Sequence, residues 1–271
     1  MKVRQACAVV ALCAAAALTP APAVAQGEQA LQFQASLYLY LPSVGGRTVL
    51  GPSDSGVQLG FDPNKVLERW NPTIMGTLEV HQGRWGGFTD LLYVDLSQTK
   101  AASTDLTIGG APLPAGASAR LKYDLRGEAW TVAGTYRGIP DRDSPADLLA
   151  GVRLLGVRQA LDWQTSGNVG SIPVQGRSGD QAVSLSNWDV VAGVKGRLTM
   201  VKERTWFVPY YVDIGTGESK FTWQLMIGFG WTFGWGEFIG AWRHLDYRMK
   251  SGAGIESLSF DGPSLGAQWR W

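Results

Sequence analysis

Two histidines and their acidic neighbours are the residues with the clearest chemical potential in this sequence. His244 and Asp246 stand two positions apart in a His-Leu-Asp motif. Side chains two apart lie on one face of a strand, so the imidazole could act as a general base that the carboxylate orients. The other histidine, His81, lies beside Gly83-Arg84, where a solvated or hydrogen-bonded role is expected rather than catalysis.

The residue types and their spacing give little support for a catalytic triad, a zinc site or a phosphate-binding loop. No Ser–His–acid spacing stands out, and two histidines are too few for the usual zinc clusters. The glycines of Gly109-Gly110 are not followed by a helical pattern, which argues against a phosphate loop. We therefore predict no catalytic residue, no metal site and no cofactor, and we predict that the protein is not an enzyme.

Residues 1–25 have the three regions of a secretory signal peptide. Lys2 and Arg4 make a positive start, residues 6–18 are uncharged and mostly Ala, Val and Leu, and Ala23-Val24-Ala25 is a small-x-small cleavage site. The apolar stretch is shorter than the roughly 20 residues that a membrane helix needs. The mature chain is therefore predicted to be residues 26–271.

The composition suits one large all-β domain. The chain has 271 residues, with 35 Gly, 12 Trp and only 17% charged residues. Loss of Lys2 and Arg4 with the signal lowers the basic residues from 24 to 22, against 23 acidic ones, so nucleic acid is not an expected partner. Cys7 and Cys13 also lie in the signal, which excludes disulfides from the mature protein.

The elements that must position any site are strands with one apolar face. In residues 221–233, FTWQLMIGFGWTF, every odd position is a large apolar residue, and every even position except Met226 is small or polar. Such period-two alternation predicts a strand, and its length and terminal Trp residues favour a lipid-facing one. The same alternation recurs in residues 74–81, 121–133, 148–154, 188–198 and 206–214.

Charged residues alternate with these apolar stripes. Lys or Arg on a lipid face at the bilayer midplane costs roughly 2–4 kcal/mol, so the charged set is predicted to face inward, where opposite charges pair in a packed polar lumen. This predicted lumen network is Glu79, Lys122, Asp124, Arg126, Glu128, Arg153, Asp189, Lys195, Arg197, Asp213, Arg243 and Arg270. Asp90 and Asp95 have opposite parity within one strand, which predicts a bulge or an end effect.

The predicted fold is a closed, antiparallel, up-and-down transmembrane β-barrel of about ten strands, with eight or twelve as alternatives. The strands are expected near residues 31–41, 72–82, 85–98, 119–137, 146–163, 187–200, 204–215, 220–233, 236–249 and 259–271. Residues 42–71, 99–118 and 164–186 are expected to be long outer loops, and residues 61–68 could form a short helix there. The connections at 83–84, 138–145, 201–203 and 234–235 are expected to be short periplasmic turns.

Tryptophans lie near the ends of the predicted strands. Two aromatic belts at the membrane–water interfaces follow from this placement. The outer belt is predicted to hold Trp163, Trp188 and Trp223, and the inner belt Trp206, Trp231, Trp269 and Trp271.

Several motifs resemble those of known outer-membrane proteins. The last strand, Leu265-Gly266-Ala267-Gln268-Trp269-Arg270-Trp271, resembles the C-terminal signature of Gram-negative outer-membrane barrels, with Trp in place of the commoner Phe. Residues 38–46, together with residues 83–86 and 90–96, resemble a family of uncharacterised small outer-membrane barrels, which implies fold and location and no reaction. The His244–Asp246 pair resembles that of omptin proteases, but no facing Asp-x-Asp pair is present, since Asp95 stands alone.

Three functions stay open at this point. The first is a structural or surface-interaction barrel in the bacterial outer membrane, and the second is a small pore or solute-uptake channel. The third is an omptin-like hydrolase. About ten strands enclose a lumen that side chains largely fill, which disfavours a wide porin. The expected partners are outer-membrane lipid and, during insertion, the barrel assembly machinery.

Overall fold

A computed structural model describes most of the chain. The described residues are 30–48, 57–60, 74–102, 107–108, 111–112, 117–141, 143–169, 172–200, 205–251 and 255–271. The predicted signal peptide (1–25) and the predicted short helix (61–68) lie outside these ranges and stay predictions. Residues 31–271 form one compact unit. Among the described residues, no helix is long and apolar enough to cross a bilayer.

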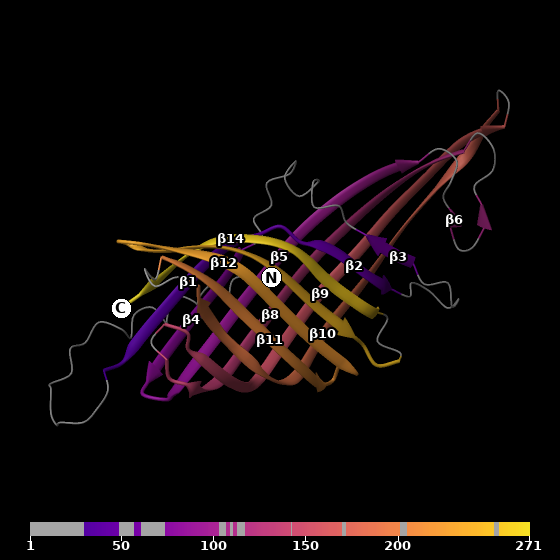
Figure 1. Ribbon diagram of the computed structural model, residues 1–271. Coiled ribbons are helices and arrows are strands. Elements are labelled where there is room, and N and C mark those ends of the chain that lie inside the picture. Colours follow the sequence, from indigo (N-terminus) through magenta and orange to yellow (C-terminus); the bar gives the residue numbers. More distant parts are fainter. Residues whose placement is uncertain are drawn as a thin grey trace, which may run out of the picture. The chain divides into compact units, whose positions relative to one another are not determined.

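The unit is built from antiparallel strands (Figure 1). They are β1 (Gln32–Tyr40), β2 (Ser43–Thr48), β3 (Val57–Gly60), β4 (Ile74–Gln82), β5 (Trp85–Ala102), β6 (Thr107–Ile108), β7 (Ala111–Pro112), β8 (Ala117–Ile139), β9 (Ala146–Val169), β10 (Ile172–Thr199), β11 (Trp206–Gly217), β12 (Phe221–Phe233), β13 (Gly236–Arg248) and β14 (Ile255–Arg270). β6 and β7 pair only with each other, outside the main sheet.

The main sheet closes on itself through its first and last strands. In the main sheet, β1, β4, β5 and β8 to β14 pair one with the next in this order. β14 also pairs with β1, with Leu39 opposite Leu265. β2 continues β1 after a break at Leu41-Pro42 and pairs with the first half of β14. The described part of the chain is therefore a closed antiparallel barrel of ten strands, as the sequence predicts, and closure leaves no sheet edge within the membrane.

Side-chain burial alternates along the barrel strands as a lipid-exposed barrel requires. On β12 the large odd-numbered residues face outward, whereas Thr222 and Gln224 are buried inside. On β9 and β10 Leu148, Val152 and Val190 are exposed, and Arg153 and Asp189 are buried. A closed barrel with a continuous apolar outer face is suited to the bacterial outer membrane, which is the location of this protein.

The two ends of the barrel differ. The turns at Gly83-Arg84 and Gly234-Trp235 are tight, and both ends of the barrel chain meet at this side, where Phe33 and Trp271 exchange backbone hydrogen bonds. At the other side β5, β8, β9 and β10 continue well past their neighbours (Figure 1). Short turns are periplasmic in barrels of this kind, so the strand extensions point to the cell exterior.

The extensions correct one prediction and decide between the two alternatives left open for β5. Residues 164–186 are mostly strand, because β9 and β10 stay paired up to Val169 and Ile172. β5 also has no bulge, since its pairing with β8 is regular from Trp85 to Ala102. The opposite parity of two carboxylates on β5 is therefore the predicted end effect, which arises because the strand is longer than the bilayer is thick. Asp90 lies inside the barrel, and Asp95 lies outside it, beyond the lipid.

The predicted orientation of β8 was wrong. Lys122, Asp124, Arg126 and Glu128 were expected in the lumen, but they lie on the outward face with Trp130, while Leu125 and Ala129 are buried inside. The physical reason is strand length: β8 has 23 residues, roughly twice what spans a bilayer. These four residues lie beyond the outer aromatic belt, where water solvates their charges.

Outward-facing residues of β9 and β10 permit a test of which residues lie in lipid. Val152 is cross-strand to Val132 and Val190 in the apolar band, whereas Ser186 lies one step beyond Trp188 toward the exterior. Val152→Arg is expected to lower the free energy of unfolding by about 2–4 kcal/mol, and Ser186→Arg by about 0–1 kcal/mol. Urea unfolding of the refolded protein in lipid vesicles measures both; equal losses would contradict this placement of the membrane.

Candidate functional site

The lumen is the candidate functional site, and its middle is crossed by two buried ion pairs. Arg243 on β13 is 2% exposed and binds Asp90 on β5 with both terminal nitrogens, at 3.2 Å from Nη1 to Oδ1 and 2.5 Å from Nη2 to Oδ2. Nη2 also donates to Gln224 Oε1 at 3.0 Å. This bidentate contact joins opposite parts of the wall.

The second buried pair is Arg153 on β9 with Asp213 on β11. Arg153 is 1% exposed, and its Nε donates to Thr131 Oγ1 at 2.9 Å. The Tyr211 hydroxyl donates to Asp213 Oδ2 at 2.5 Å. Each buried ion pair thus includes at least one neutral polar partner, a condition that helps ionic groups persist in a low-dielectric interior.

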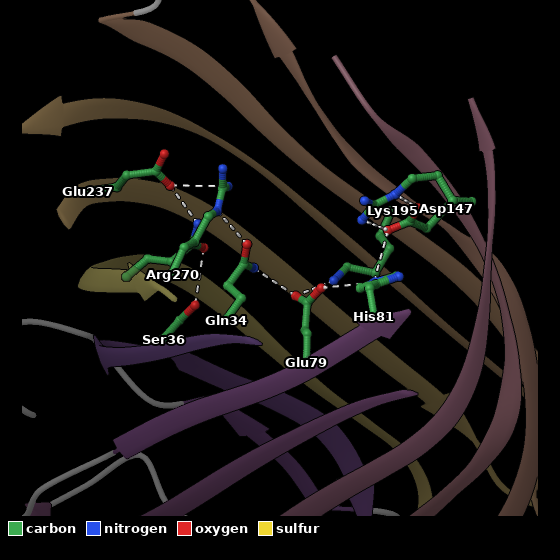
Figure 2. A network of polar contacts seen from close by, with 10 residues as sticks. Gln34, Ser36, Glu79, His81, Asp147, Lys195, Glu237 and Arg270 are labelled. Carbon is green, nitrogen blue, oxygen red and sulfur yellow. Dashed lines mark hydrogen bonds and ion pairs between the residues drawn. The ribbon is translucent and has the colours of Figure 1, made fainter. Parts of the chain in front are cut away.

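The periplasmic mouth holds a polar network (Figure 2). Glu237 accepts hydrogen bonds from Arg197 Nη1 at 2.6 Å and Gln268 Nε2 at 2.6 Å, and Arg270 Nη2 lies 3.2 Å from its Oε2. Arg270 Nε donates to Gln34 Oε1 at 2.8 Å, and Gln34 Nε2 donates to Glu79 Oε1 at 2.9 Å. The wall is therefore cross-linked around the mouth.

The same network continues to a group around His81. Lys195 forms an ion pair with Glu79, and Arg137 Nε donates to Asp147 Oδ1 at 2.9 Å. His81 lies between the two carboxylates, as Figure 2 shows, with Nε2 3.5 Å from Asp147 Oδ2 and 3.9 Å from Glu79 Oε2. The mouth therefore holds a histidine and two carboxylates that already have basic partners.

The outer half of the lumen is mostly apolar, apart from buried polar side chains such as Asn187, Asp189 and Gln159, and the sequence did not predict this. Buried side chains from several strands fill it in one continuous cluster. Its largest members include Tyr40, Met75, Leu92, Leu125, Leu155, Leu245, Tyr247, Leu258 and Phe260, with Val44 of β2 among them. The lumen is thus mainly polar near the periplasm, where Phe207 and Ile239 of the same cluster also lie, ionic at its middle and mainly apolar toward the exterior.

The structure brings together eight of the predicted lumen residues. Facing inward are Glu79, Arg153, Asp189, Lys195, Arg197, Asp213, Arg243 and Arg270. Asp189 accepts from the Ser219 backbone N–H at 2.8 Å rather than from a basic side chain. The four charged residues of β8 are absent from the lumen, as described above.

Four charged lumen residues were not identified from the sequence: Asp90, Arg137, Asp147 and Glu237. Parity could have found two of them. Asp147 shares its parity with Arg153 on β9, and Glu237 shares its parity with Arg243 on β13. Arg137 was hidden by the inverted orientation of β8, and Asp90 by the expected bulge in β5.

The His-Leu-Asp motif does not form a site at the barrel mouth. His244 and Asp246 lie on the outward face of β13, and His244 Nδ1 is 2.8 Å from Asp261 Oδ1 on β14. Trp223 packs on the imidazole at 4.7 Å between ring centroids. Asp95 points outward on β5 and pairs with Arg126 instead. An omptin-like arrangement across the lumen is therefore absent from the described residues.

Tryptophans ring the outer surface. Trp188 and Trp223 lie toward the outer end, and the side chain of Trp163 lies outside the described residues. At the inner end Trp206 packs on Trp231, with ring centroids 3.7 Å apart, and Trp269 and Trp271 are exposed there too. Further outward-facing Trp side chains, not predicted for the belts, are Trp85, Trp130, Trp235 and Trp242.

Comparisons with known proteins find the fold only. No family model matches the sequence, and no curated protein matches it significantly. The chain is similar to the outer membrane protease OmpT from Escherichia coli, at 8% identity and a TM-score of 0.42 over 91% of this chain and 99% of that one. It is also similar to Ail, the attachment invasion locus protein of Yersinia pestis, at 10% identity and a TM-score of 0.29 over 89% and 99% of the chains. These neighbours are outer-membrane barrels, and their identities and scores are too low to transfer an activity.

The buried ion pairs lead to a stability prediction. Arg243→Met leaves Asp90 buried without its counter-charge and is expected to lower the free energy of unfolding by about 3–5 kcal/mol. Adding Asp90→Leu removes the stranded charge and is expected to restore most of the loss. The matched control is Arg126→Met, which breaks an exposed ion pair with Asp95 and is expected to cost less than about 1 kcal/mol. Denaturant unfolding in detergent micelles compares the three, and a large loss in the control would refute the assignment of inside and outside.

Proposed function

We propose that this protein is a sealed outer-membrane barrel that displays a rigid β-sheet at the cell surface for contact with another polypeptide. The observation that carries the proposal is the combination of a filled lumen with strands that continue beyond the membrane. A filled lumen leaves no path for a solute, which argues against transport. Ordering long paired strands outside the lipid costs conformational entropy, so we infer that these strands have a function there.

The filled lumen supports a sealed barrel. The ion pairs Arg153–Asp213 and Arg243–Asp90 cross its middle, and Leu125, Leu155 and Phe260 are at most 1% exposed in the apolar layer beyond them. An ion moving through would have to separate buried charges and then enter a dehydrated apolar layer, and both steps are expensive. A small pore is the alternative, and the experiment below separates the two.

The strand extensions support the contact role. Pairing between β10 and β11 stops at Asp189 and Gly217, where Glu218 caps the ladder by exchanging hydrogen bonds with the Trp188 backbone. From Trp188 back to Ile172, β10 has a paired strand on its β9 side and none on its other side among the described residues. A long free edge presents backbone donors and acceptors to which an extended peptide can add as a new strand.

The sealed state can be measured directly. Protein reconstituted in a planar bilayer is expected to give no conductance steps, because the ionic and apolar layers block the lumen together. Insertion is verified on the same sample by heat-modifiable gel migration. Regular conductance steps from verified barrels would favour the small pore and reject the proposal.

The contact role needs a variant that removes only the extension. Gln159 and Val183 are opposite each other on β9 and β10, and Leu96 and Leu125 are opposite each other on β5 and β8. Replacing residues 160–182 and residues 97–124 each with Asn-Gly closes a tight hairpin at both pairs and leaves no new free edge on β8. The trimmed barrel is expected to fold and to lose the binding of extended peptides that the intact protein selects from a random peptide library. Equal selection by both proteins, or no selected peptide at all, would argue against a peptide-binding edge; lipid and peptide hydrolysis assays test the remaining enzymatic alternative.

A further inference from the structure

We propose that Glu79, His81 and Asp147 form a binding site for a divalent transition-metal ion of the Zn²⁺ type at the periplasmic mouth. Two carboxylates alone would not indicate such a site. The second observation is His81 itself, which is 5% exposed and has no hydrogen-bond partner for either ring nitrogen among the described residues. A buried, unpartnered imidazole costs free energy, and a metal ion on Nε2 would remove part of that cost.

The spacing of the three groups fits a small tetrahedral ion. One oxygen from each carboxylate and one imidazole nitrogen lie within 4.8 Å of one another. The distances from His81 Nε2 are 3.5 Å to Asp147 Oδ2 and 3.9 Å to Glu79 Oε2. Zinc ligands at about 2.0–2.2 Å from the ion are separated by roughly 3.3–3.6 Å, so both separations from Nε2 are close to what the ion requires. The two carboxylate oxygens lie within 4.8 Å of each other and would approach on binding, and water can fill the fourth position.

The surroundings fix the ligands in place. His81 is cross-strand to Gly86, and a Cβ there would come within 2.5 Å of Nδ1, so only glycine leaves room for the ring. This packing leaves Nε2 facing the carboxylates (Figure 2). Lys195 and Gln34 hold Glu79 through Oε1, which leaves Oε2 for the ion. Arg137 holds both oxygens of Asp147, at 2.9 Å from Nε to Oδ1 and 3.3 Å from Nη2 to Oδ2, so the ion would bind a second lone pair of Oδ2. Such outer partners orient metal ligands.

The charge balance decides which ion the site binds and how tightly it binds that ion. Lys195 and Arg137 already neutralise the two carboxylates, so a hard cation that depends on several anionic oxygens, such as Ca²⁺ or Mg²⁺, is disfavoured. An imidazole with two oxygens suits Zn²⁺, Co²⁺ or Cu²⁺. The same neutralisation lowers the affinity of the site for the ion. Because β5 and β8 lie between β4 and β9 in the sheet, a bound ion would brace two strands that are not neighbours.

The test uses the full-length mature protein, refolded in detergent without a polyhistidine tag and titrated with Co²⁺. A tetrahedral site gives a visible Co²⁺ absorption band that Zn²⁺ displaces, and Zn²⁺ is expected to raise the melting midpoint of the folded gel band. The matched pair of variants is His81→Gln and His244→Gln, since the chain has just these two histidines. His81→Gln is expected to weaken binding by at least about 100-fold, whereas His244→Gln keeps wild-type affinity.

Glu79→Gln provides a second ligand variant in case the first fails to refold, and it is expected to weaken the Co²⁺ band as well. Absence of any band in the wild-type protein would overturn the proposal. So would equal affinity in wild type and in whichever ligand variant folds, or loss of the band in His244→Gln. None of these outcomes depends on whether the barrel conducts or binds peptides, so the metal site and the proposed function are tested independently.

Discussion

The pairing of opposite charges inside a closed wall is the interaction on which this structure depends. An arginine in a lumen this narrow is stable only while its partner is present, and Arg153 and Arg243 each have a carboxylate contributed by a different strand. Those contacts require every strand to keep its register, because a shift of one residue would turn the charges toward lipid. Closure by β1 and β14 makes the register cooperative around the whole barrel. The sealed lumen that we propose would be a consequence of this packing, since the atoms that fix the register also occupy the lumen.

The layered lumen divides the protein into parts with different roles. The ionic middle and the apolar outer layer hold the wall together, while the polar periplasmic mouth stays close to water and carries the one buried imidazole, His81. Beyond the lipid, β5 and β8–β10 continue as a paired sheet whose charged outward residues, such as Arg126, are solvated. A rigid barrel within the membrane would suit the proposed display of a sheet at the cell surface, and it would leave the periplasmic mouth for the proposed metal site.

Much of the fold could be predicted from the sequence, because period-two alternation determines both strand identity and the face that meets lipid. On β9 to β13 this placed Arg153, Asp213 and Arg243 in the lumen. The pattern failed on β8, where Arg126 and Glu128 alternate with aliphatic residues as lumen charges would, but beyond the bilayer the rule that charges face inward no longer applies. Sequence alone does not state where along a strand the membrane ends. The partners of Arg243 and His81 come from strands distant in the chain, so the ion pairs and the cluster at the mouth required the three-dimensional structure.

The most direct test is the phase of lipid exposure along β8, where the structure and the sequence pattern disagree. The two native cysteines lie in the predicted signal, so single cysteines can be introduced from Ala129 to Tyr136 and spin-labelled in vesicles. Electron paramagnetic resonance then measures collisions with oxygen, which concentrates in lipid, and with a water-soluble nickel complex. We predict oxygen maxima at residues 130, 132, 134 and 136, with the odd positions shielded from both reagents. Oxygen maxima at the odd positions, or nickel access to them through an open lumen, would contradict the proposed sealed barrel.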